Sequence, residues 1–106
     1  MTNQRADTYA VVPKLRELTE TMLFGDVWER SELSKRDRSL VTIAALIALY
    51  RTQELKGHLG RALDNGVTQL EISEVITHLA LYAGWPCGVN GARVANEVFD
   101  ERGLSY

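Results

Sequence analysis

The most apolar part of the chain is the segment Leu40–Tyr50, LVTIAALIALY, in which only Thr42 is polar. A helix at a protein surface normally has an apolar stripe on one side and polar residues on the other. This segment is apolar all round, so as a helix it needs cover on every side. It would rise only about 16 Å, which is too short to cross a bilayer. We therefore predict a central helix of a soluble protein, covered in part by other subunits.

Apolar residues at helical spacing predict five main helices joined by short connections. Pro13 can occupy the first turn of the earliest helix, and Gly25 ends it. Ser34 is followed by Asp37, a pair that resembles a capping box. The predicted helices span residues 12–23, 35–50, 53–65, 69–83 and 88–101, with one short turn at 26–30.

Start and stop signals are clearer in the second half of the chain. Thr52 can cap the third helix, and Thr68 with Glu71 forms a T-x-x-E capping box for the fourth. Gly84 stops the fourth helix, and Pro86 prevents its continuation. We find no segment with the pattern of a strand, so the predicted fold class is all-α, a single-domain helical bundle.

The length of 106 residues indicates one domain over residues 1–106, with residues 1–8 expected to be disordered. A net charge of −2 gives no reason to expect nucleic acid or an anionic membrane as a partner. No apolar run follows Arg5, so no signal peptide is predicted. The single cysteine, Cys87, excludes an internal disulfide and a CxxC motif. Together these features favour the cytoplasm.

The chain has two histidines, whose side chains titrate near neutral pH. His58 lies at the edge of the apolar stripe of its helix, one turn after Glu54, which can orient or charge the imidazole. His78 lies one turn before Tyr82. On spacing alone, an exposed Glu–His pair on a solvated helix face is the simpler interpretation. The two histidines lack HxxxH or HExxH spacing, so no metal site is predicted.

Other chemically notable residues also have simple structural interpretations. Cys87 lies near a helix start, where the helix dipole can lower the pKa of a thiol, but an inert cysteine beside the core is the simpler interpretation. Gly88 and Gly91 indicate a close contact between helices. Trp28 and Trp85 are most simply packing residues. The cations most simply interpreted as surface charges are Arg36, Arg38, Arg51 and Arg61.

Three segments in order, RDRSLVTIAAL, HLGRALDNGVT and HLALYAGWP, closely resemble the carboxymuconolactone decarboxylase family. The resemblance covers about residues 25–99 and continues through NGARVANEVF. It implies an all-α, alkylhydroperoxidase D-like bundle that assembles into a homo-oligomer, as a trimer or hexamer. Such an assembly agrees with the uncovered apolar helix.

The family has two main chemical branches, and the sequence separates them. In the alkylhydroperoxidase D-like branch, a CxxC pair lies four residues before a histidine. If that histidine is His58, the cysteine positions hold Arg51 and Glu54, so the thiol chemistry is excluded. The chain is similar to the other branch, the γ-carboxymuconolactone decarboxylases of aromatic-compound breakdown, in its RDRSL and YAGWP segments.

The resemblance implies a decarboxylase acting on a lactone with two carboxylates, without metal or organic cofactor. The lactone carbonyl accepts the electrons that CO2 leaves behind, so the protein must supply an oxygen-charge stabiliser, a proton donor and a carboxylate anchor. His58 occupies the family's histidine position and is the candidate acid. The remaining candidates follow from chemistry and proximity: Glu54 to orient His58, His78 as a second acid, Arg51, Arg38 or Arg61 as the anchor, and Trp85 and Tyr82 as substrate-binding residues.

Two other classes of function stay open at this point. One is an oligomeric small-molecule-binding protein without decarboxylase activity, whose sign would be an unperturbed His58 facing bulk water. The other is a redox protein that uses Cys87 alone, pairing across subunits or with a partner. A thiol that is unreactive under native conditions would remove the second idea.

Overall fold

The structure is a computed structural model, and it describes residues 7–105. The chain divides into two compact units, residues 1–34 and 35–106, and each is described by itself. Most of the segment predicted to be disordered, residues 1–6, lies outside the described residues. A single domain over the whole chain stays a prediction.

The first unit is helical over most of its described length, and its helix changes pitch along the chain. Asp7 accepts a hydrogen bond from the backbone N–H of Tyr9 at 3.0 Å and pairs with Arg16. The rings of Phe24 and Trp28 lie 6.0 Å apart, centroid to centroid. The elements are a 3-10 turn at Thr8–Val11, α1 at Pro13–Leu18, a π-helical segment at Thr19–Leu23 and a 3-10 turn at Val27–Glu29. The predicted helix over 12–23 and the short turn after it are therefore confirmed.

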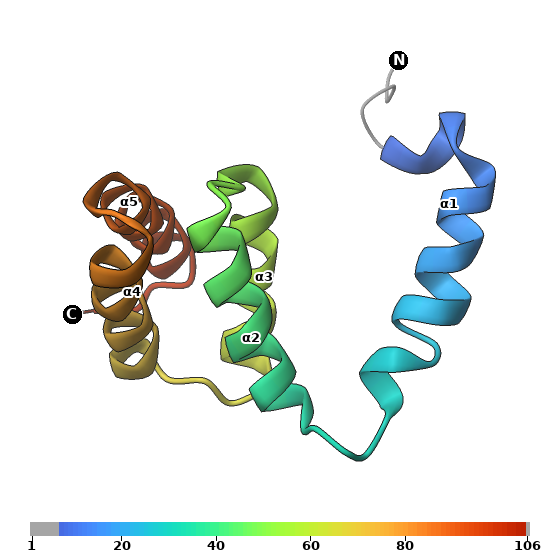
Figure 1. The fold of residues 1–106 in the computed structure, drawn as a ribbon, viewed down its shortest axis with the longest axis horizontal. Helices are drawn as coiled ribbons and strands as arrows, with labels where there is room; N and C mark the ends of the chain where they lie inside the picture. The colour runs from blue at the N-terminus through green and yellow to red at the C-terminus, as the bar shows by residue number, and fades with distance from the viewer. Residues whose placement is uncertain (1–6, 106) are drawn as a thin grey trace. The chain divides into compact units, whose positions relative to one another are not determined.

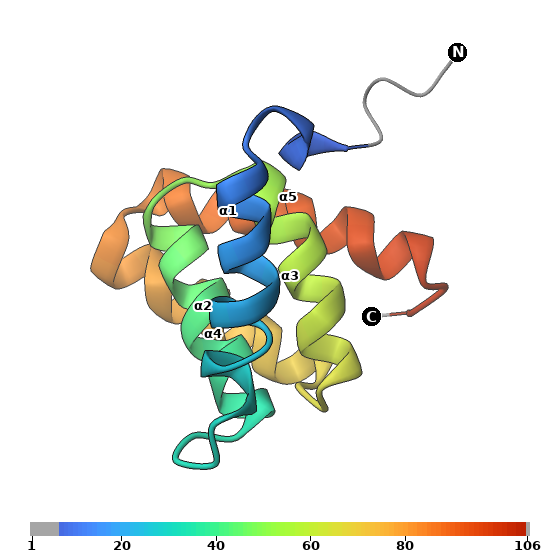
Figure 2. The same cartoon turned by 90° about the vertical axis from the view of Figure 1, so that its right-hand side faces the viewer.

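The second unit is a four-helix arrangement consisting of α2 (Lys35–Ala48), α3 (Thr52–Asp64), α4 (Gln69–Ala83) and α5 (Trp85–Glu101). Helices α2 and α3 lie side by side, as do α4 and α5 (Figure 1). Helix α2 packs against all three of the others, and Figure 2 shows it in front of α4. The described residues contain no strand, so the predicted all-α class is confirmed.

One side of α2 forms the middle of the core, as its apolar sequence predicts. Ile43 and Ile47 are 0% and 2% exposed. The opposite side is open, because Val41 is 61% exposed and Leu49, the first residue after α2, is 62% exposed. Thus this unit covers only part of the apolar helix, and cover by other subunits stays a prediction.

The capping box of α4 is confirmed and carries an additional ion pair. Thr68 Oγ1 accepts from the Glu71 backbone N–H at 3.1 Å, while Glu71 Oε1 accepts from the Thr68 backbone N–H at 2.9 Å. Arg36, in the first turn of α2, pairs with Glu71. The hydrogen bond from the Thr68 backbone, followed by that from Arg36, lowers the pKa of Glu71 below its usual value. This cation at the start of α2 therefore ties α2 to α4.

Two predicted helix starts were wrong. Helix α5 begins at Trp85 rather than residue 88, because Pro86 fits its first turn, where a missing N–H costs nothing. Gly84 makes the sharp turn between α4 and α5 with a φ of 116°. Helix α3 begins at Thr52, so its N-cap is Arg51, which makes no side-chain capping hydrogen bond.

The turn between α2 and α3 places Tyr50 in a conformation that glycine usually adopts. Its φ is 66°, the only positive φ of a non-glycine residue among those described. The Tyr50 N–H donates to the carbonyl of Ile47, and the Arg51 N–H donates to that of Leu46. This is a Schellman motif with tyrosine at the glycine position. A bulky residue there costs about 1–3 kcal/mol, so its side chain needs a compensating role.

Across residues 7–105, none of the helices combines the length and apolarity needed to cross a membrane. The cytoplasmic location inferred from the sequence stays a prediction.

Candidate functional site

Five of the predicted site residues lie on α2 and α3. His58 is half-buried on α3, and Arg38 is half-buried on α2. The other three, Arg51, Glu54 and Arg61, lie exposed along α3 from its N-cap to its last turn. Of these residues, Arg61 is the one whose charge acts on His58.

The environment of His58 favours its neutral form. Burial lowers the pKa of His58 below its usual value, and the positive charge of Arg61, three residues later, lowers it further. Glu54 is exposed, and within residues 7–105 no hydrogen bond or ion pair joins it to His58. The orienting role of Glu54 therefore stays a prediction, since burial first, and then the cation Arg61, lowers the pKa of His58.

The other three predicted site residues lie on α4 and α5. The rings of His78 and Tyr82 stack at 4.5 Å between centroids, and both side chains are exposed. Trp85, at the first residue of α5, is 65% exposed. It lines a hollow of about 260 Å³ together with Leu81 and Val89. These residues form an exposed aromatic group beside an apolar surface.

His58 and His78 lie on helices that make little direct contact with each other. Helices α3 and α4 each pack against α2 and α5 more than against each other. The role of His78 as a second acid stays a prediction.

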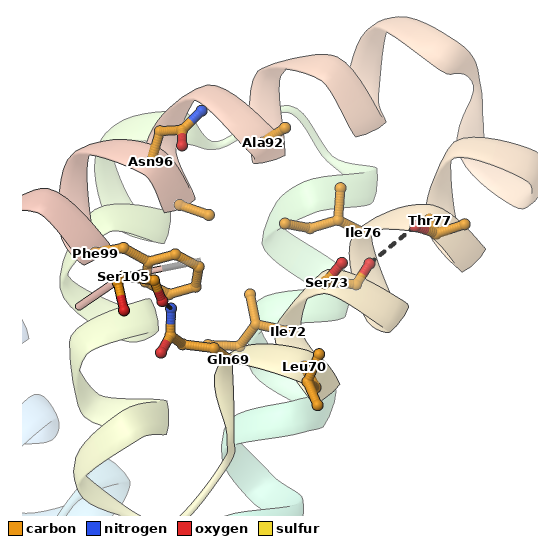
Figure 3. A pocket seen from close by; sticks show the side chains of 11 residues that line it. Gln69, Leu70, Ile72, Ser73, Ile76, Thr77, Ala92, Asn96, Phe99 and Ser105 are labelled. Atoms are coloured by element: carbon orange, nitrogen blue, oxygen red, sulfur yellow. Dashed lines mark hydrogen bonds between the residues drawn. The ribbon is translucent and has the colours of Figure 1, made fainter.

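A groove of about 470 Å³ runs between α4 and α5 (Figure 3). Ile72, Ile76 and Phe99 form its apolar floor. Its remaining lining residues are Gln69, Leu70, Ser73, Thr77, Ala92, Ala95, Asn96 and Ser105. None of these side chains titrates near neutral pH, so the groove can hold an apolar group but has no group of its own to deliver a proton.

A second hollow, of about 510 Å³, lies between α3 and α5 and is highly charged. Its lining includes Arg61, but not His58. Lys56 pairs with Glu101 at 2.9 Å, and Arg102 pairs with Asp64 at 2.9 Å. Because these charges largely neutralise one another, the hollow is a weak candidate for binding an anion.

The structure also reveals polar contacts that the sequence interpretation missed. Asn65 donates to the buried hydroxyl of Ser39 at 3.0 Å, and Asn90 donates to the Tyr50 hydroxyl at 2.7 Å. The sequence offered a partial signal for the turn, though not for the contact. The short connection at residues 49–51 contains no glycine or asparagine, so a left-handed turn there must use an ordinary residue.

The described residues also bear on metal binding and on thiol redox chemistry, the two other chemistries considered from the sequence. Among residues 7–105, no group of three or more His, Cys, Asp or Glu side chains is arranged to hold a metal ion. Cys87 is buried in the core, and its Sγ lies 3.7 Å from the carbonyl oxygen of Ala48. Such a buried thiol is poorly placed for the redox function considered above.

Comparison with known proteins gives one family and several relatives. The model of the carboxymuconolactone decarboxylase family matches residues 13–97. A 4-carboxymuconolactone decarboxylase from Acinetobacter baylyi is 46% identical over 82 residues, which are 77% of this chain and 61% of the relative. A nitrosuccinic acid decarboxylase from Metarhizium robertsii is 35% identical over 86 residues, 81% of this chain and 60% of the relative.

A third relative has no activity in its name. It is an uncharacterized 15.0 kDa protein from Paracoccus denitrificans, 31% identical over 94 residues, 86% of this chain and 69% of the relative. The chain spans about three fifths of the length of the two relatives named as decarboxylases. The sequence resemblance to this family is confirmed, and the match extends beyond residue 25 to Pro13.

Proposed function

Because the chain belongs to the carboxymuconolactone decarboxylase family, we propose that it is a decarboxylase of a small carboxylated substrate. The specific proposal is a cofactor-free carboxy-lyase acting on 4-carboxymuconolactone or a related carboxylated lactone, with His58 as the general acid. The observation that carries the proposal is the 46% identity to a protein named 4-carboxymuconolactone decarboxylase. A second relative is also named a decarboxylase, and its substrate is an acid of a different kind.

The chemistry of the proposed substrate explains why few protein groups are needed. One carboxylate leaves as CO2 from a carbon that is conjugated, through the ring double bond, to the lactone carbonyl. The bonding electrons move into that carbonyl and form a dienolate, which is then protonated on the ring. The protein must stabilise the oxygen charge, deliver the proton and hold the remaining carboxylate.

His58 is suited to deliver this proton only when a substrate is bound. In the free protein, burial and Arg61 lower its pKa and favour the neutral imidazole. A carboxylate placed beside His58 and Arg61 offsets both effects and favours the imidazolium. Substrate binding would thus raise the pKa of His58 and prepare the proton donor.

The cations of α2 and α3 supply the proposed carboxylate anchor. Arg51 is exposed at the N-cap of α3, and within residues 7–105 it makes no hydrogen bond or ion pair through its side chain. It remains available for a bidentate contact with a carboxylate. Arg61, with its electrostatic effect on His58, and the half-buried Arg38 are the other proposed anchors.

We also propose that the protein is a homo-oligomer, a trimer or hexamer. The exposed stripe of α2 and the exposed Leu70, Leu81 and Trp85 give one protomer a large uncovered apolar surface. Subunit contacts would remove this surface from water and can combine the histidine of α3 with the aromatic group of α4 from another protomer. Light scattering of the purified chain measures the assembly.

An oligomeric small-molecule-binding protein without decarboxylase activity is the alternative. The α4–α5 groove favours it, because the groove is open and apolar and lacks a titratable lining residue. The lowered pKa of His58 is the observation against it, since an unperturbed histidine in bulk water was expected for a binding protein.

A substrate panel tests the proposed function. The purified protein is incubated with 4-carboxymuconolactone, a lactone lacking the second carboxylate, and nitrosuccinate, and CO2 release is measured with and without a chelator. We expect CO2 release from the carboxylated lactone at a kcat of about 1–1,000 per second, unchanged by the chelator. Binding of the lactone without CO2 release would select the alternative.

A further inference from the structure

Asn90, on α5, holds the strained residue Tyr50 through its amide group. Its Nδ2 donates to the Tyr50 hydroxyl oxygen at 2.7 Å and to the carbonyl of Pro86 at 2.8 Å. Its Oδ1 accepts from Arg93 Nη1 at 3.0 Å. With both ends of the amide in use, Asn90 is fixed in orientation, so Tyr50 contacts a rigid partner on another helix.

We call the connection between α2 and α3, residues 49–51, the α2–α3 corner. A second contact joins the start of this corner to α5. The Sγ of Cys87, one turn before Asn90, lies 3.7 Å from the carbonyl oxygen of Ala48, the last residue of α2. The early turns of α5 thus contact both the last residue of α2, Ala48, and the turn residue Tyr50. The last residue of this corner is Arg51, whose carbonyl accepts the first backbone hydrogen bond of α3, from Leu55.

We propose that Tyr50 is a positioning residue, clamped by Asn90, that sets the direction in which Arg51 leaves the α2–α3 corner. The inference rests on the proposed function of Arg51 as a carboxylate anchor. A glycine at position 50 would form the same turn without strain, so the turn alone does not account for the tyrosine. The side chain accounts for it, since the phenol connects the corner to α5 by a hydrogen bond that glycine lacks.

The test compares Asn90→Ala, Tyr50→Phe and the double variant, with Gln53→Ala as the control. The Gln53 side chain is exposed in the first turn of α3 and makes no hydrogen bond within residues 7–105. Hydrogen exchange is followed for the amides of Tyr50, Arg51 and Leu55, and KM and kcat are measured for the carboxylated lactone. We expect each single variant to speed exchange and to raise KM by about fivefold, the equivalent of one lost hydrogen bond.

The double variant should be no worse than either single variant, because both remove the same contact. kcat should stay within about twofold, since an anchor that acts equally on substrate and transition state changes KM alone. Tyr50→Gly separates the side chain from the backbone turn. It should keep the fold and still raise KM.

Several results would overturn the proposal. Unchanged exchange at the corner, or additive effects in the double variant, would show that Asn90 does not clamp Tyr50. Faster exchange with an unchanged KM, or a Tyr50→Gly variant with the wild-type KM, would show that the corner does not position Arg51. If the wild type releases no CO2 from any substrate, the proposed function fails, and the exchange rates still decide whether the clamp exists.

Discussion

His58→Ala is expected to lower kcat for CO2 release by about 10²–10⁴-fold, the usual contribution of a positioned general acid. The variant removes the proposed proton donor, while the partial burial of the ring means that only a small cavity is left on α3. His58→Gln keeps most of the volume without a group that titrates near neutral pH. Both variants should lose activity to a similar extent, as measured by initial rates under saturating substrate.

Two comparisons make this result specific. Gln53→Ala changes another polar residue of α3, one whose side chain is exposed and makes no hydrogen bond within residues 7–105, so it should keep the wild-type rate. Circular dichroism and light scattering should show an unchanged fold and assembly in the His58 variants. Wild-type turnover in His58→Ala would eliminate His58 as the acid.

Gly88→Ala is expected to destabilise the fold by about 1–3 kcal/mol, because it overpacks the contact between α4 and α5. Gly88 is buried, and a Cβ at this position would lie 2.5 Å from the Cβ and 3.1 Å from the Cα of Ala80. One of these atoms belongs to the backbone of α4, so the two helices must move apart to admit the methyl group.

Gly57→Ala is the matched control for this effect. Gly57 lies inside α3, and a Cβ there would meet no atom within 4 Å. Alanine should stabilise this helix position by about 0.5–1 kcal/mol through its better helix propensity. Denaturant unfolding of both variants and the wild type measures the change in the free energy of unfolding for each substitution. Equal stability of Gly88→Ala and Gly57→Ala would disprove the close contact.

The second half of the chain was predicted well where local signals agree with the packing. Helix α4 has the predicted bounds because Thr68 and Glu71 cap its start and Gly84 ends it. The start of α5 was missed because proline can either block a helix or begin one. Gly84, two residues before Pro86, turns the chain with a φ of 116°, so Pro86 falls in the first turn of α5, and only the turn geometry reveals this choice.

The surroundings of His58 differ from those that the sequence predicts. The family's histidine position made His58 the candidate acid, a role that stays a prediction, and sequence spacing made Glu54 its expected partner. In the structure, the charged residue that lowers the pKa of His58, in addition to burial, is Arg61. Arg61 lies one turn after His58, whereas Glu54 lies one turn before it. Residues three and four positions apart are both neighbours on a helix. The side-chain rotamers and the burial therefore decide which neighbour affects the histidine. Tyr50 was missed because its contact with Asn90 joins residues that lie 40 positions apart.

The pH dependence of kcat/KM for CO2 release tests the proposed proton donor most directly, because this parameter follows the ionisation of the free enzyme. A donor must be protonated, and burial and Arg61 lower the pKa of His58 below its usual 6.5. We therefore predict that kcat/KM falls tenfold per pH unit above a midpoint below 6.5, and that His58→Gln abolishes this fall. A kcat/KM that rises with pH through the same range, or that stays level, would contradict the account.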